Sequence, residues 1–157
     1  EANSFRNILI EPVALSDTFG NATLSLVEEN VGASSIKDVA EERAVGGSVV
    51  VQVATLDSYL DKFDRIDVIK IDIEGAEYEA LLGAKAVLRK FKPVVILEFS
   101  PQIYEKDQVG KTLDFYVYIK NMGYSLQIIG APDINLENRI QSRQFTELHA
   151  NILCLPK

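Results

Sequence analysis

The sequence predicts an α/β layered fold with a mainly parallel sheet and an antiparallel strand pair at its C-terminal edge. From residue 66 onward the predicted elements run strand, helix, strand, helix, strand, loop, strand, an alternation typical of layered α/β domains. Val94–Phe99 is almost continuously apolar, as is usual for parallel strands that are covered on both faces. The last two predicted strands have no helix between them, so they could pair antiparallel at one edge.

Length and charge limit the classes of protein that this chain can represent. Its 157 residues are enough for one domain with a sizeable core. A hydrophobic share of 47% and a charged share of 25% are those of a folded globular protein. The net charge of −7 argues against nucleic acid or an anionic membrane as the main partner, because both attract clustered Lys and Arg. The oligomeric state is left open.

Cysteine content and hydropathy predict a cytoplasmic location with no membrane segment. The single cysteine, Cys154, cannot form a disulfide within the chain, and its apolar surroundings predict a small core residue. No apolar run approaches the ~20 residues that cross a bilayer. The polar start at residues 1–4 shows no signal peptide. Without a Cys/His cluster, we expect no structural zinc site.

The first half of the chain predicts three strands and one short helix. Its elements are a short strand within Asn7–Leu15 broken by Pro12, a turn at Ser16–Asn21, strands at Ala22–Val27 and Ser48–Ala54, a long loop at Glu28–Gly47 and a helix at Leu56–Phe63. Thr55 is the predicted N-cap of that helix, and Asp57 suits the dipole at its first turn. A loop of this length within a compact domain is often functional.

The second half predicts four strands and two helices. They are strands at Ile66–Ile71, Val94–Phe99, Tyr124–Ile129 and Leu148–Leu155, helices at Gly75–Phe91 and Thr112–Met122, and a polar loop at Ala131–Gln144. Apolar residues in the first helix recur at spacings of three and four, from Leu81 to Phe91, which gives that helix one apolar face. Pro93 ends the first helix, and Gly123 ends the second.

Acidic residues stand at the ends of two predicted strands. Asp72 follows Ile71 directly, Glu98 lies near the end of Val94–Phe99, and Glu74 lies at the turn into the following helix. Ligands of open α/β sheets bind beyond the carboxyl ends of the strands. If the two strands are neighbours, both carboxylates could face one crevice.

Such a cluster allows three kinds of chemistry. One carboxylate could take a proton from an attacking hydroxyl, a pair could hold a hard divalent cation, or a carboxylate could hydrogen-bond a substrate hydroxyl or a cationic ligand. Glu77 has capping-box spacing from Glu74, so we interpret it as a helix-start residue. His149, the single histidine, lies at the start of the closing strand, where a structural or exposed role is the commoner one.

The run from Ile66 to Ala84 resembles the FkbM family of methyltransferases. That family has a strand ending in Lys-Ile-Asp-x-Glu-Gly-Ala-Glu, which stands here at residues 70–77, followed by a helix with a Leu-x-Gly-Ala-like segment. Further likenesses are Lys92-Pro93 before an apolar strand that ends near Glu98, the run Val13–Gly20, and, more loosely, Asn30–Ser35. Together they span most of residues 13–99 in the expected order.

The resemblance implies a Rossmann-like methyltransferase fold that binds S-adenosylmethionine and methylates a hydroxyl of a small molecule or sugar. By this analogy Asp72 lies beside the reacting methyl group and the acceptor, so it belongs to both the catalytic and the cofactor-binding residues. Glu74 and Glu98 complete the expected catalytic group. Ala14 and Leu15 are expected near the adenine end of the cofactor.

One part of the family pattern does not occur in this chain. The family opens with a strand and a loop of the Asp-x-Gly-x-Asn-x-Gly kind, followed by a second strand that ends in an acidic residue. We therefore expect residues 1–157 to be a single Rossmann-like domain that is only part of a complete one. Two other hypotheses stay open: a non-catalytic binding or interaction domain on a truncated Rossmann-like scaffold, and a metal-dependent enzyme using Asp72, Glu74 and Glu98.

Overall fold

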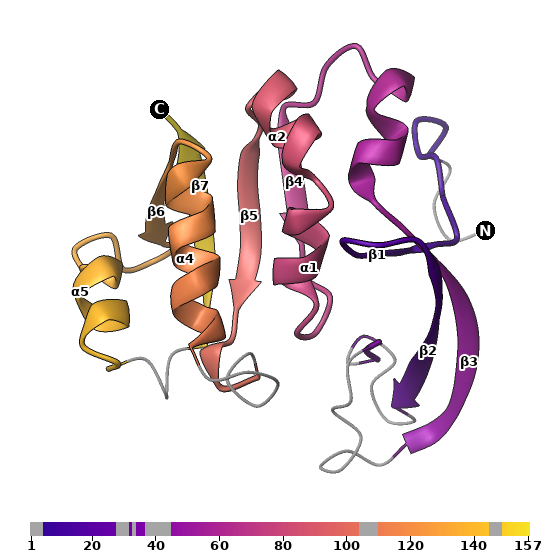
Figure 1. Cartoon of the computed structure of the whole chain (residues 1–157), viewed down its shortest axis with the longest axis horizontal. Coiled ribbons are helices and arrows are strands. Elements are labelled where there is room, and N and C mark those ends of the chain that lie inside the picture. The colour runs from indigo at the N-terminus through magenta and orange to yellow at the C-terminus, as the bar shows by residue number, and fades with distance from the viewer. Residues whose placement is uncertain (1–4, 28–31, 33, 37–44, 104–109, 145–148) are drawn as a thin grey trace.

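The computed structural model describes residues 5–27, 32, 34–36, 45–103, 110–144 and 149–157. These residues form a mixed α/β structure with two sheets (Figure 1), one with strand order β1-β3-β2 and one with strand order β4-β5-β7-β6. Within these ranges, no helix combines the length and the apolar character that crossing a membrane requires.

The three-stranded sheet comprises β1 (Ala14–Leu15), β2 (Gly20–Val27) and β3 (Val45–Ala54). β1 is parallel to β3, and β2 is antiparallel to it. The strand predicted within Asn7–Leu15 is therefore reduced to two residues after Pro12. β3 begins earlier than predicted, because pairing with the end of β2 outweighs the low strand propensity of its glycines. Most of the predicted loop Glu28–Gly47 lies outside the described residues.

The four-stranded sheet comprises β4 (Val68–Ile71), β5 (Val94–Phe99), β6 (Tyr124–Ile128) and β7 (Ala150–Pro156). β4 and β5 are parallel, whereas β7 is antiparallel to both β5 and β6. The expected antiparallel pair at the C-terminal edge is thus confirmed. The expectation of a mainly parallel sheet is wrong, because β7 returns between β5 and β6 and makes two antiparallel ladders.

The helices depart from the predicted ones at three places. They are the 3₁₀-helix η3 (Leu56–Lys62) and the α-helices α1 (Glu77–Leu82), α2 (Lys85–Phe91), α4 (Lys111–Asn121) and α5 (Leu136–Gln141). The predicted helix Gly75–Phe91 is divided into α1 and α2, and the helix after Thr55 is a 3₁₀-helix. The predicted loop Ala131–Gln144 contains α5, which Leu136 and Ile140 anchor in the core.

A side chain from η3 explains why α2 begins separately. The Asp57 carboxylate accepts hydrogen bonds of 2.9 Å from the backbone N–H groups of both Ala86 and Val87. These are donors that the first turn of a helix leaves unsatisfied. Asp57 was expected to serve the start of its own helix, whereas the structure shows that it caps a helix almost 30 residues later.

The core lies between the four-stranded sheet and the helices α1, α2 and α4, which cover one face of that sheet (Figure 1). Alternate β5 residues, Val95, Leu97 and Phe99, are buried there, and the residues between them are only partly buried. We expected both faces of β5 to be covered. Among the described residues, only one face is fully buried. Cys154 is a buried core residue as predicted, and burial raises the pKa of its thiol to about 12.

Gly83, between α1 and α2, lies close to the backbone of the segment that follows β1. A Cβ atom there would lie 2.0 Å from the backbone oxygen of Ser16, just after β1. We expect Gly83→Ala to destabilise the fold by about 2–3 kcal/mol, because backbone cannot yield as a side chain can. Urea unfolding followed by far-UV circular dichroism checks this.

Gly123→Ala is the matched control for this substitution. Gly123 has a φ of 87° but open space around its Cα, so its replacement causes backbone strain without a collision. We expect Gly83→Ala to displace the segment after β1, and we expect Gly123→Ala to leave that segment in place. If backbone amide NMR shifts of residues 13–17 are unchanged in Gly83→Ala, the close approach does not position that segment.

Candidate functional site

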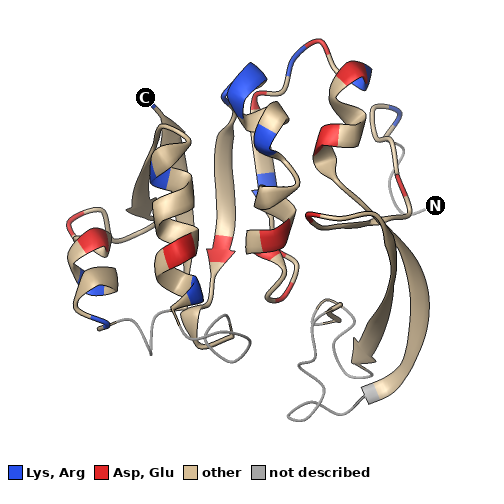
Figure 2. Ribbon diagram, viewed as in Figure 1, with Lys and Arg blue, Asp and Glu red and all other residues tan. Residues whose placement is uncertain are grey.

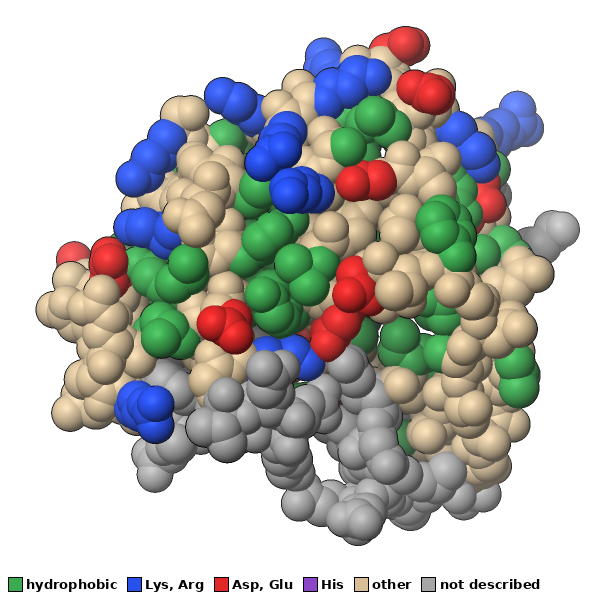
Figure 3. All heavy atoms as spheres, in the orientation of Figure 1, with side chains coloured by type: hydrophobic (Ala, Val, Ile, Leu, Met, Phe, Trp, Pro, Cys, Tyr) green, Lys and Arg blue, Asp and Glu red, His purple; other side chains and the backbone are tan. Residues whose placement is uncertain are grey.

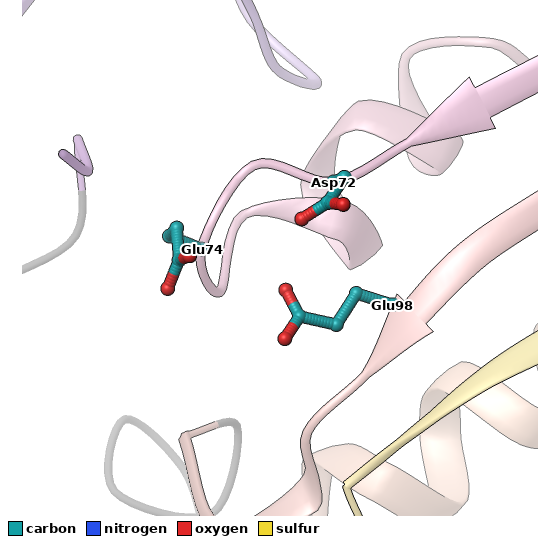
Figure 4. Close-up of side chains that lie close together, drawn as sticks. All are labelled: Asp72, Glu74 and Glu98. Atoms are coloured by element: carbon teal, nitrogen blue, oxygen red, sulfur yellow. The ribbon is translucent and has the colours of Figure 1, made fainter. Parts of the chain in front are cut away.

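Strand register brings Asp72 and Glu98 together. Ile71 is paired with Leu97 at the end of the parallel β4–β5 ladder, so the next residues, Asp72 and Glu98, stand opposite each other. Figure 4 shows their carboxylates converging on one space, with Glu74 on the turn beside them. One oxygen of each of the three side chains lies within 4.8 Å of the others. The three predicted catalytic residues therefore lie together.

Acidic residues lie at the carboxyl ends of the parallel strands, and residues of both charges are also spread over the other elements. Figure 2 shows acidic residues at the end of β5 and at the turn from β4 into α1, whereas Lys and Arg gather at the opposite end, on α2. The acidic end is the carboxyl end of the parallel strands, where α/β folds bind ligands.

Asp72 is held ionised by Lys70. The Lys70 ammonium lies 2.6 Å from Asp72 Oδ2, because residues two apart on a strand project to the same side. This hydrogen bond is the main cause that lowers the pKa of Asp72, opposed in part by burial. Asp72 is consequently a carboxylate that could accept a proton or attract a cation.

Glu98 has the opposite electrostatic environment. Its side chain is 12% exposed, and burial, followed by the negative charges of Glu74, Asp72 and Glu77, raises its pKa, while His149 counteracts them. Two neighbouring carboxyl groups whose pKa values move apart are suited to different roles. Asp72 favours the ionised form, and Glu98 more readily holds a proton.

Glu77 shapes the turn that carries Glu74. Its carboxylate accepts hydrogen bonds from the backbone N–H groups of Ile73 and Gly75, at 3.1–3.2 Å, and the residue is 1% exposed. Glu77 begins α1, as its interpretation as a helix-start residue required, but Ala76 rather than Glu74 is the N-cap. The prediction of a capping box between Glu74 and Glu77 is therefore wrong. Glu77 instead stabilises the β4–α1 turn through its hydrogen bonds to the backbone.

This turn is strained and is tied to the other sheet. Glu74 and Gly75 both adopt positive φ values, 54° and 102°, a conformation that is unfavourable for Glu. The Ser35 hydroxyl donates a 2.7 Å hydrogen bond to the Glu74 carbonyl, and Ser35 is in turn bridged to Ser25 in β2. Backbone strain that is held in place by surrounding contacts is common at functional sites.

Two further residues join the site that the sequence did not indicate. Ser100 follows β5 and His149 precedes β7, and since Phe99 pairs with Ala150 the next step places them opposite each other. The Ser100 hydroxyl lies 2.8 Å from His149 Nδ1, and His149 Nε2 lies 3.1 Å from Glu98 Oε1. The proximity of Ser100, His149 and Glu98 follows from the pairing of β7 with β5, and that pairing could not be predicted from the sequence.

A cavity of about 570 Å³ opens beside Asp72, between the two sheets. Most of its lining is apolar and includes Leu24, Leu56, Ile69 and Leu81. Figure 3 shows hydrophobic side chains around openings between the helix-covered sheet and the strands β2 and β3.

The predicted cofactor-binding residues Ala14, Leu15 and Asp72 all line this cavity. Of the predicted catalytic residues, Asp72 lines the cavity, whereas Glu74 and Glu98 are not among its lining residues. The cavity thus combines a mostly apolar lining with a few charged residues, Glu11, Lys70 and Asp72, a common composition of small-molecule sites.

The chain has an α/β fold with a carboxylate cluster at the ends of two parallel strands and an adjoining, mostly apolar cavity, an arrangement that is common at the ligand sites of α/β proteins. Comparison with family models identifies it further: the methyltransferase FkbM domain matches residues 2–126. The chain belongs to the FkbM methyltransferase family. Comparisons with curated proteins and with solved structures gave no significant match.

Proposed function

We propose that this chain takes part in S-adenosylmethionine-dependent methylation of a hydroxyl group on a small molecule or sugar. The observation that carries this proposal is the single cavity that brings Ala14 and Leu15 together with Asp72. Family membership supports methyl transfer. The parallel strands β4 and β5, connected through α1 and α2 with acidic residues at their ends, support a Rossmann-like methyltransferase fold. The lone buried cysteine favours the cytoplasm.

The cavity suits the chemistry of this cofactor. Its volume falls within the range of about 300–1,000 Å³ that small-molecule sites occupy, and its apolar walls at Ala14 and Leu15 suit a flat adenine ring. Asp72 supplies negative charge where a sulfonium cation requires it. The cofactor supplies an electrophilic methyl group when bound.

The residues of this chain would orient the acceptor and take up its proton. Asp72 favours the ionised form, lines the cavity and is oriented by Lys70, so it can accept a hydrogen bond from an acceptor hydroxyl. As that oxygen reacts, Asp72 receives the proton. Positioning the two reactants accounts for much of the rate, because an in-line transfer depends on geometry.

Calorimetric titration of the full-length protein with S-adenosylmethionine tests the proposal. We expect binding in the wild-type protein and at least tenfold weaker binding in Ala14→Phe, because a phenyl ring would occupy the cavity. Val50→Phe is the control, since Val50 is exposed on β3 outside the cavity. Absence of binding by the full-length protein would refute the methyltransferase proposal and favour a non-catalytic binding domain.

A further inference from the structure

Polar side chains form a continuous path from the cavity to solvent. Asp72 lines the cavity, its carboxylate lies within 4.8 Å of that of Glu98, and Glu98 Oε1 lies 3.1 Å from His149 Nε2. The side chains of Asp72, Glu98 and His149 are 53%, 12% and 64% exposed, so Glu98 is the most buried of the three and the path ends at an imidazole in contact with solvent. Each of these groups can both accept and donate a proton.

We propose that Glu98 and His149 relay to solvent the proton that Asp72 takes up. The inference rests on the proposed function. The bond between the acceptor oxygen and the methyl carbon forms as the carbon–sulfur bond breaks, the electron pair stays on sulfur, and the hydroxyl proton passes to Asp72. Glu98 receives this proton from Asp72 and a proton passes from Glu98 to His149 Nε2, and the imidazolium that forms then loses a proton to water.

Ser100 positions the imidazole for this role. It is 2% exposed, and its hydroxyl lies 2.8 Å from His149 Nδ1 and 3.4 Å from Glu98 Oε1. Strand register explains the arrangement, because Glu98 and Ser100 project to the same side after β5 and His149 stands opposite Ser100. A histidine held by one ring nitrogen presents the other in a defined direction.

The surrounding charges suit proton movement along this path. Four described groups act on Glu98: Glu74, Asp72 and Glu77 favour its protonated form, and His149 favours its ionised form. Lys70 acts on Asp72 and favours its ionised form. Of the two carboxyl groups, Glu98 therefore holds a proton more readily than Asp72, and it lies on the side of the imidazole.

The rate of methyl transfer in His149→Ala tests the relay. Full-length protein is assayed with S-adenosylmethionine carrying a radiolabelled methyl group and a panel of methyl glycosides as acceptors. We expect kcat to fall about 10- to 100-fold, at the lower end of acid–base effects, with S-adenosylmethionine affinity unchanged. Free imidazole should restore much of the rate, because the exposed site leaves room for it.

Gln127→Ala is the control, since Gln127 is exposed on β6 away from the path and should show neither the loss nor the rescue. Full activity of His149→Ala across the pH range, or a loss that imidazole does not restore, overturns the relay. A second measurement does not depend on turnover. Carboxyl NMR of the ligand-free protein should show a higher pKa for Glu98 in His149→Ala, because a charge that lowers it is removed.

The two measurements separate the relay from the proposed function. Unchanged titration of Glu98 overturns the relay whether or not transfer is observed. A raised pKa of Glu98 together with no transfer and no S-adenosylmethionine binding in the wild-type protein refutes the proposed function, and with it the relay. Transfer in the wild-type protein with the expected loss and rescue supports both.

Discussion

Asp72→Asn should lower kcat for methyl transfer by at least about 100-fold, within the range that general acid–base catalysis contributes. The amide keeps the size of the carboxylate and can still hydrogen-bond, but it cannot take up the acceptor proton. Affinity for S-adenosylmethionine should fall much less, because Ala14, Leu15 and the apolar walls are untouched. Single-turnover assays combined with calorimetry distinguish the two quantities.

Lys70→Met tests whether Lys70 keeps Asp72 ionised. The Lys70 ammonium lowers the pKa of Asp72, so its removal should raise that pKa. The acid limb of the pH–rate profile should then move to higher pH, since Asp72 must be ionised to act as a base. A profile that does not move would show that Asp72 is not the titrating group, and a fully active Asp72→Asn would remove Asp72 from the mechanism.

The sequence predicted that the Asp72 and Glu98 carboxylates lie close together, because the relevant signals are local. An apolar strand followed by an acidic residue predicts Asp72 and Glu98 at strand ends, and the parallel β4–β5 register placed them side by side. β5 was predicted with the bounds that the structure shows, since six apolar-rich residues after Pro93 leave little alternative.

Features that depend on distant contacts could not be predicted from local patterns. β7 inserts between β5 and β6, and no local signal encodes that order. The close approach of Ser16 to Gly83, between α1 and α2, joins residues more than 60 positions apart in the sequence. His149 was set aside as a lone histidine for the same reason, because its contacts with Ser100 and Glu98 follow from the β5–β7 pairing.

Glu77→Ala should have the largest effect on stability, about 2–5 kcal/mol, because it leaves buried backbone donors unsatisfied and creates a cavity. The carboxylate accepts hydrogen bonds from the N–H groups of Ile73 and Gly75, and the residue is 1% exposed. Glu77→Gln retains one oxygen and the volume, so we expect it to lose less. Since the chain has no tryptophan, far-UV circular dichroism in urea measures the change.

Asp61→Ala is the control for Glu77→Ala, because Asp61 is an exposed acidic residue of η3 and surface changes of this kind alter stability by at most about 0.5 kcal/mol.

Glu77 should affect methyl transfer as well as stability. The two N–H groups that it binds, those of Ile73 and Gly75, flank Glu74, so Glu77 fixes the strained turn between Asp72 and α1. Glu77→Gln should therefore lower methyl transfer even where the protein remains folded. Equal stability losses in Asp61→Ala and Glu77→Ala would refute this account of the turn.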